Sequence, residues 1–224
     1  MSIEIALEGA RVHYGPLEAL HGIDLAVPHR RLTVLLGRNG SGRTTALRAL
    51  AGTVPLTAGR VRWRGADVTR LPAYARARRG LAFTPDLRAV FTSLTVAENL
   101  ELVASGGDIS PAFEAYPALR PLRSRRAGTL SGGEQRMLAI SRALLSPARL
   151  VLLDEPGQGM SAAMAARTHA LLGELDATVV VAEQSLPRGL RAAAGLVYEL
   201  RRGEVVFGGE PGELSELGRL GSFS

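Results

Sequence analysis

Apolar residues along the chain fall into short runs separated by glycine and proline, and such runs predict β-strands. The run from Leu32 to Leu36 is almost continuously apolar, as is typical of a strand buried on both faces of a parallel sheet. Residues 3–14 and 23–27, bounded by Gly15-Pro16 and Gly22, predict strands of an antiparallel sheet. Further strands are expected at residues 61–64, 81–84, 150–153 and 178–181, with a closing hairpin at 196–200 and 204–207.

Helix signals occupy the intervening segments. We expect a first helix from about Thr44 to Ala51, ending at Gly52. A second helix should begin after Pro72, and a third should extend from about 162 to 175. Between residues 86 and 146 the pattern becomes mainly helical, and the last residues resemble a helix with a frayed tail. This alternation predicts an α/β fold with a helical insertion. We expect one domain over residues 1–224, with an α/β lobe formed by 1–85 and 147–224 and a helical lobe formed by 86–146.

Composition narrows the class of protein. With 224 residues the chain is long enough for a substantial core, as one large domain or two small lobes. The absence of cysteine excludes disulfides, thiol catalysis and thiolate metal sites, and it fits a reducing compartment. There is no signal-peptide pattern, and no apolar run approaches the roughly 18 residues needed to span a membrane. We therefore expect a soluble or peripheral protein.

The formal net charge of +6 comes from arginine, because the sequence contains no lysine. The densest clusters are Arg76, Arg78 and Arg79, and then residues 123–126. Neither cluster is interleaved with aromatic residues, as a base-stacking surface would be. We therefore expect no nucleic-acid partner, and acidic partner loops or lipid headgroups stay open as alternatives.

A short polar motif at Leu130–Gln135 is the most specific signal for chemistry. Ser131 and Glu134 have the spacing of a capping box, which predicts that a helix begins there. Gly132 and Gly133 carry no β-carbon, so a phosphate group can approach the free amides at the positive end of the helix. The alternative is an ordinary capped surface helix.

A glycine-rich turn between the strand at 32–36 and the next helix has the context of a phosphate loop. Its backbone amides can surround phosphates, and the Thr44 hydroxyl is placed to bind Mg²⁺. Arg43 stands where a phosphate loop has lysine, and its planar fork is not equivalent to a compact ammonium. We expect binding to survive and hydrolysis to slow. A glycine-rich turn without function is the alternative. The candidate nucleotide-binding residues are Gly37, Asn39, Gly40, Ser41, Gly42, Arg43, Thr44 and Thr45.

Asp154 and Glu155 follow a buried strand, at the edge where open α/β sheets bind ligands. We expect Asp154 to anchor Mg²⁺ through water, and Glu155 to orient the attacking water or accept its proton. The alternative is that both acidic residues simply terminate the strand.

These motifs together resemble the ATP-binding subunits of ABC transporters over nearly the whole chain. The resemblance is strongest to branched-chain amino-acid importers, and it extends through Tyr14-Gly15 and residues 93–100, 127–130 and 182–184. Urea and short-chain amide importers are close relatives. The family implies a P-loop NTPase core with a mixed sheet, an antiparallel β subdomain and a helical insertion that carries Leu130–Gln135 as its signature.

The resemblance assigns roles to further residues. Tyr14 is similar to the aromatic that stacks on adenine, although a lone tyrosine near a turn is often simply half-buried. Asp86 stands where the family has glutamine or glutamate, linking Mg²⁺ and water to the membrane-domain contact. Gln184 replaces the switch histidine, as in this importer branch, and cannot become cationic. Residues 157–161 depart from the family's usual dimer-interface loop.

The family also implies ATP and Mg²⁺ as cofactors, and several partners. These are a second, non-identical ABC ATPase subunit, transmembrane permeases and, indirectly, an extracytoplasmic solute-binding protein, which places the chain at the cytoplasmic face of the membrane. Ser131, Gly132 and Gly133 would serve the opposite subunit. Arg43 and Asp86 differ from the family's usual residues, and both would lie in this chain's own nucleotide pocket. We therefore expect this pocket to hydrolyse ATP slowly, while the signature of this chain supports the faster site of the partner subunit. The retained Glu155 argues against an inactive site.

Two other functions are compatible with the residues. One is a regulatory or structural subunit that binds ATP and completes a dimer without productive hydrolysis, which Arg43 motivates. The other is a cassette protein that acts on DNA or ribosomes, which lacks support because the sequence shows no long coiled coil and no second cassette.

Overall fold

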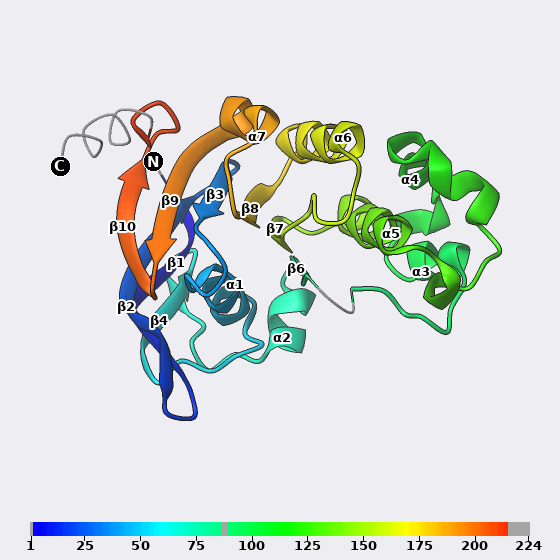
Figure 1. Ribbon diagram of the computed structural model, residues 1–224. Coiled ribbons are helices and arrows are strands. Elements are labelled where there is room, and N and C mark those ends of the chain that lie inside the picture. Colours follow the sequence, from blue (N-terminus) through cyan, green and yellow to red (C-terminus); the bar gives the residue numbers. More distant parts are fainter. Residues whose placement is uncertain (1, 87–88, 215–224) are drawn as a thin grey trace.

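The computed structural model describes residues 2–86 and 89–214, and it consists of two β-sheets with helices between and beside them (Figure 1). The expected helix and frayed tail at the end of the chain lie outside the described residues, apart from the start of the segment. None of the described helices is long and apolar enough to span a membrane.

The smaller sheet is antiparallel, as expected for the first part of the chain. Its order is β2-β1-β4-β5, and its strands are β1 (Ile3–Tyr14), β2 (Leu17–Pro28), β4 (Ala58–Trp63) and β5 (Ala66–Asp67). The prediction that β2 starts only after Gly22 is wrong. Gly22 adopts φ +82° inside the strand, where the pairing register with β1 shifts, so this glycine forms a β-bulge instead of a break.

The larger sheet has the order β10-β9-β3-β8-β7-β6, and its strands are parallel except for the β9–β10 hairpin. Its strands are β3 (Leu32–Leu36), β6 (Leu81–Thr84), β7 (Leu150–Asp154), β8 (Thr178–Glu183), β9 (Ala194–Arg201) and β10 (Glu204–Gly209). The predicted strands and the hairpin are therefore confirmed, with bounds that differ by a few residues.

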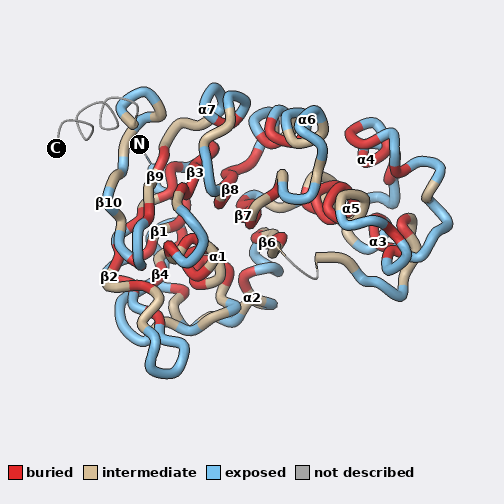
Figure 2. Tube along the Cα trace, in the orientation of Figure 1, coloured by how far each residue is buried: buried red, intermediate tan, exposed pale blue. Residues whose placement is uncertain are grey.

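The central strands are buried on both faces, as the apolar run in β3 predicts (Figure 2). Val34, Val151 and Val181 face one apolar core, which they share with the helices beyond β7. Leu35 and Leu152, in turn, face a second core that lies between the two sheets. The helix α1 (Arg43–Ala51) supplies the middle of this second core and contacts strands of both sheets.

The helical segment lies to one side of the larger sheet, away from the antiparallel sheet (Figure 1). It contains α3 (Val96–Glu101), α4 (Ser110–Ala115), α5 (Gly132–Leu145) and the 3₁₀ helices η1 (Ser105–Gly107), η2 (Pro117–Leu122) and η3 (Ala127–Thr129). Both predicted capping boxes are present, Thr95 with Glu98 and Ser131 with Glu134.

The remaining helices flank the larger sheet. They are α2 (Ala73–Arg78), α6 (Ala162–Gly173) and α7 (Arg188–Ala193). The sequence predicts α2 and α6, and it misses α7 and the two-residue strand β5. Both missed elements are too short to show a periodic apolar pattern.

A buried arginine fixes the C-terminal end of α1. Arg76 in α2 is almost completely buried, and its guanidinium donates hydrogen bonds of 2.6–3.3 Å to five carbonyl oxygens. Two of these carbonyls, on Ala49 and Leu50, lie in the last turn of α1, where helix carbonyls lack partners within the helix. Burial lowers the pKa of Arg76 to about 10. Arg76 therefore ties α1 to the loop that precedes α2.

Replacing this guanidinium should destabilise the fold. Arg76→Met keeps an apolar stem but leaves carbonyls such as that of Leu50 without a donor, so we expect the free energy of unfolding to fall by about 2–4 kcal/mol. Urea denaturation of the full chain measures this change. Arg79→Met is the matched control, because Arg79 is exposed at the end of the same helix. An equal loss in both variants would contradict the role of Arg76.

Candidate functional site

The predicted site residues converge at the edge of the larger sheet where β3 and β7 end. A pocket of about 720 Å³ opens there between the turn after β3, the end of β7 and the β1–β2 turn. It is lined by Tyr14, Leu17, Glu18, Ala19, His21, Arg38, Asn39, Gly40, Ser41, Gly42, Arg43, Thr44, Thr45, Asp86, Asp154, Glu155, Gln158, Arg202 and Gly203. Most of the candidate nucleotide and metal residues are in this set.

Glycines give the turn after β3 its shape. Gly40 and Gly42 adopt φ values of +78° and +104°, which residues with a side chain rarely adopt. At Gly37 a β-carbon would collide with the Leu200 carbonyl and with Ser41, so Gly37 acts by allowing close packing and does not itself line the pocket. The turn delivers Gly42 to the N-cap of α1, and within the described residues no side chain caps this end. The first amides of α1 are therefore free to bind an anion.

Three polar atoms at this edge are buried without a hydrogen-bond partner in the described part of the chain. They are Ser41 Oγ, Arg43 Nη1 and Asp154 Oδ2. Buried polar groups are normally paired, so these atoms indicate a ligand that offers both acceptors and a cation. A phosphate suits the two donors. A hydrated Mg²⁺ suits the free carboxylate oxygen beside the Thr44 hydroxyl, which donates to Asp154 Oδ1 at 3.2 Å. The residues present therefore fit a magnesium–phosphate group.

Burial is also the largest influence on Asp154. It raises the pKa of this carboxyl, the nearby charges of Asp86 and Glu155 act in the same direction, and the Thr44 hydrogen bond and Arg43 partly oppose them. A carboxylate that is poorly solvated and near two other carboxylates is stabilised by a cation. Asp154 thus has the environment of a metal-binding group.

Glu155 has a network of its own. Its Oε1 atom accepts a hydrogen bond from Arg43 Nη2 at 3.0 Å, and Gln184 Nε2 donates to Oε1 and Oε2 at 3.1 and 3.3 Å. Gln184 does not line the pocket, and it reaches the site through this contact. The backbone of Glu155 has φ +47°, an uncommon conformation for a residue with a side chain.

Asp86 and Tyr14 also line the pocket. Asp86 Oδ1 is 3.9 Å from Arg48 Nη2, which is a long ion pair. Tyr14 is 41 % exposed, as a ring available for stacking must be.

The residues Ser131, Gly132 and Gly133 are not brought into this pocket. They begin α5, where Ser131 accepts from the Glu134 amide and the Glu134 carboxylate accepts from the Ser131 amide. Both Ser131 and Gly132 are exposed, and a β-carbon at Gly133 would lie 3.0 Å from the Gly159 carbonyl. The N-terminus of α5 therefore packs beside the loop that follows Glu155, with its first residues facing solvent.

The sequence motifs do not identify Arg136, which connects the helix that follows Ser131 with the segments around Asp86 and Asp154-Glu155. This buried side chain of α5 donates at 2.8 Å to the carbonyls of Pro85, Asp154 and Glu155. Burial lowers its pKa, and the surrounding carboxylates oppose that shift. The signal was present in the sequence, because position 136 shares a helix face with Ile140 and Ala143, and an arginine on a buried face needs acceptors. Gln158, His21 and Arg202 are further pocket residues that no motif identifies.

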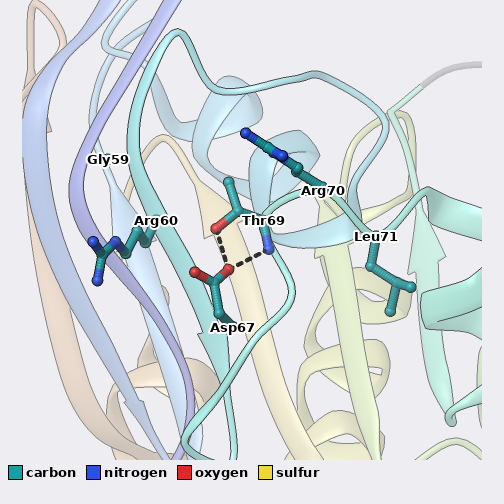
Figure 3. Close-up of a pocket in the computed structure, with 6 residues that line it drawn as sticks. All are labelled: Gly59, Arg60, Asp67, Thr69, Arg70 and Leu71. Carbon is teal, nitrogen blue, oxygen red and sulfur yellow. Dashed lines mark hydrogen bonds between the residues drawn. The ribbon is translucent and has the colours of Figure 1, made fainter.

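A second hollow of about 640 Å³ lies on the antiparallel sheet, lined by Gly59, Arg60, Asp67, Thr69, Arg70 and Leu71 (Figure 3). Its carboxylate is already engaged, since Asp67 Oδ1 accepts hydrogen bonds from the amide and hydroxyl of Thr69 at 2.9 and 2.6 Å. The hydrogen bonds drawn in this view join only Asp67 and Thr69, and neither arginine takes part in them (Figure 3). This geometry describes a turn and not a reactive centre.

Comparisons with known proteins show which proteins the chain resembles. A family model described as "ABC transporter" matches residues 20–158. The chain is 36 % identical to a probable branched-chain amino acid transport ATP-binding protein LivF of Archaeoglobus fulgidus, covering 91 % of this chain and 90 % of the relative. It is 34 % identical to the high-affinity branched-chain amino acid transport ATP-binding protein BraG of Pseudomonas aeruginosa, covering 90 % and 91 %.

Among solved structures, the chain is similar to an ATP-binding cassette of an ABC transporter in its ADP conformation. The TM-score is 0.77 at 25 % identity, with 94 % of this chain and 91 % of the other covered. The predicted P-loop NTPase fold, with its mixed sheet, antiparallel β subdomain and helical insertion, is therefore confirmed.

Weakening the Arg136 contacts should loosen α5 from the site edge. Arg136→Lys keeps the charge but cannot donate to three separated carbonyls, so we expect the free energy of unfolding to fall by about 1–3 kcal/mol. Chemical denaturation measures the loss, and the exposed Arg123→Lys serves as control. An Arg136→Lys protein as stable as the control would show that the three hydrogen bonds contribute little.

Proposed function

This chain belongs to the ABC transporter family of ATP-binding subunits, and from that premise we propose that it couples ATP binding and hydrolysis to solute uptake through separate membrane permeases. The main support for this function is the pocket at the ends of β3 and β7. There a phosphate loop, two carboxylates and buried unpartnered donors face the same space.

The phosphate chain of ATP would lie along the turn from Arg38 to Gly42. The free amides of α1 and the arginine that follows the turn supply positive potential there. Thr44 and Asp154 would hold Mg²⁺, with Asp86 nearby, and the ion would neutralise charge on the phosphate oxygens. Asn39, Ser41 and Thr45 complete the lining of this end of the pocket.

Hydrolysis requires a group that orients water and takes up its proton. Glu155 is the candidate: the water oxygen attacks the γ-phosphorus, the bond to the β-phosphate oxygen breaks, and the water proton passes to the carboxylate. Gln184, which already contacts Glu155, is placed to contact the γ-phosphate as well. Asp86, which lines the same pocket, would help to position the water.

Tyr14 is the candidate for stacking on adenine. It lies at the mouth of the same pocket, on the β1–β2 side, with an exposed ring. Stacking requires a flat π-face and no particular hydrogen-bond pattern.

A dimer follows from the position of the signature. Since Ser131, Gly132 and Gly133 are outside the pocket of their own chain, they would complete the pocket of a second, non-identical ATPase subunit. We infer a two-lobed domain, with residues 1–85 and 147–224 in one lobe and 86–146 in the other. ATP held between two subunits would close them, and loss of the γ-phosphate would let them separate.

The transported solute is proposed from the relatives. Branched-chain amino acids are the leading class, because the LivF and BraG relatives carry that description, and amide or urea solutes are the related alternatives. Such a system requires transmembrane permeases, an extracytoplasmic solute-binding protein and a peripheral position for this chain at the cytoplasmic face of the membrane.

A second candidate function is a regulatory or structural subunit that binds ATP with slow or no hydrolysis. The ion pair between Arg43 and Glu155 favours it, because the candidate base already has a charged partner. The retention of Glu155 next to Asp154 favours the active subunit.

Turnover in the assembled complex separates the two functions. With permeases and the second ATPase present, Glu155→Gln should lower ATP turnover from this site roughly 10²–10⁴-fold, the usual contribution of a general base. The second subunit should carry its own inactivating substitution, so that the assay reports this site alone. Glu174→Gln, an exposed change at the end of α6, is the control. Turnover that Glu155→Gln leaves unchanged would favour the regulatory function.

Membrane association depends on the permeases. We expect the chain to sediment with membranes from cells that express the cognate permeases, and to stay in the supernatant when they are deleted. Immunoblotting of the two fractions measures this distribution. Equal distribution with and without the permeases would exclude the transporter assignment.

A further inference from the structure

Arg43 and Glu155 form the most buried ion pair of the pocket. The Arg43 side chain is 4 % exposed and the Glu155 side chain 13 % exposed, and Nη2 lies 3.0 Å from Oε1. The two residues are 112 positions apart in the sequence. Breaking a buried pair costs more than breaking a surface pair, because the remaining charge has no solvent to stabilise it. Arg43 is therefore a strong restraint on Glu155.

Glu155 is held from other directions as well. Gln184 donates to both carboxylate oxygens, and Arg136 donates to the backbone carbonyl of the same residue. Oε1 accepts two hydrogen bonds and Oε2 accepts one, so of the roughly four acceptor sites of the carboxylate only one, on Oε2, is left for water. The charged contact from Arg43 is the strongest of these restraints.

The second arm of Arg43 is free. Its Nη1 atom is buried and has no hydrogen-bond partner among the residues the structure describes, and the side chain lines the proposed nucleotide pocket. An unpaired buried donor on a charged group is costly, and an anionic oxygen would satisfy it. A lysine ammonium is a compact point charge, whereas the guanidinium presents donors in a fixed fork.

We propose that Arg43 is a two-armed positioning residue: Nη2 restrains the Glu155 carboxylate, and Nη1 binds a phosphate oxygen of the nucleotide. This inference rests on the proposed function, since it takes ATP as the occupant of the pocket. One cation is then shared between phosphate and carboxylate. Because Arg43 is shared with Glu155, it binds the nucleotide less strongly. Hydrolysis is slowed because Arg43 occupies Oε1, so that only Oε2 of the carboxylate is open to the attacking water.

A thermodynamic cycle on nucleotide affinity tests the shared cation. Titration calorimetry on the full chain measures the Kd for a non-hydrolysable ATP analogue with Mg²⁺ in the parent, Arg43→Lys, Glu155→Gln and the double variant. Glu155→Gln should tighten binding about tenfold in the parent, a coupling usual for contacting residues. In the Arg43→Lys background the same change should alter the Kd less than about twofold.

Glu18→Gln is the matched control for charge alone. Glu18 is a carboxylate of the same pocket, but its ion-pair partner is Arg11 and not Arg43. If Glu155→Gln acts by releasing Arg43, Glu18→Gln should not tighten binding. Equal tightening by both substitutions would overturn the proposal, and this comparison stands even if Arg43→Lys fails to fold.

Turnover supplies the second measurement. In the assembled complex Arg43→Lys should raise kcat about threefold or more with a smaller change in KM, because the loss of the restraint acts on the water-attack step. An unchanged or lower kcat in Arg43→Lys would overturn the inference. Equal effects of Glu155→Gln on the Kd in the parent and in the Arg43→Lys background would overturn it as well. If no variant binds the analogue, the proposed function itself fails, and that result is distinct from additive effects in chains that do bind.

Discussion

The burial of β3, β7 and β8 on both faces is the constraint on which the rest of the structure depends. These parallel strands pack against helices on one side and against α1 on the other. Polar residues that follow them can therefore reach solvent only where the strands end. The turn after β3, the two carboxylates after β7 and Gln184 after β8 therefore meet at one edge of the sheet. The site is a consequence of parallel strand order.

Buried arginines then connect the parts that this edge brings together. Arg76 binds the C-terminal end of α1, and Arg136 joins α5 to the backbone of Glu155. Arg43 joins α1 to the carboxylate of Glu155. In a chain without lysine, each of these positions uses the forked guanidinium to reach more than one acceptor or to leave one donor free. The hydrogen bonds of Arg136 thus connect the helical segment directly to the backbone of Asp154 and Glu155.

Local patterns in the sequence predict much of this architecture. The capping boxes at Thr95 and Ser131, the strand at 32–36 and the glycine turn before α1 depend on neighbours within a few residues, so the sequence contains their signals. The bulge at Gly22 is misread because a glycine inside a strand and a glycine between strands look alike in one dimension.

The contacts around Glu155 lie beyond such reasoning. The sequence singles out Arg43, Glu155 and Gln184 separately, but only the fold shows that the first and last both donate to the carboxylate between them. Arg136 escapes notice because it belongs to no phosphate or metal motif, although its place on an apolar helix face marks it as a charge in need of acceptors. Pairings over such sequence separations depend on the topology of the sheet.

A crystal structure of the chain with Mg²⁺ and a non-hydrolysable ATP analogue would test the proposed site most directly. We expect phosphate oxygens within hydrogen-bonding distance of Ser41 Oγ and Arg43 Nη1, with the metal between the Thr44 hydroxyl and Asp154. A nucleotide bound elsewhere, or phosphates in the pocket that leave those buried atoms without partners, would contradict it.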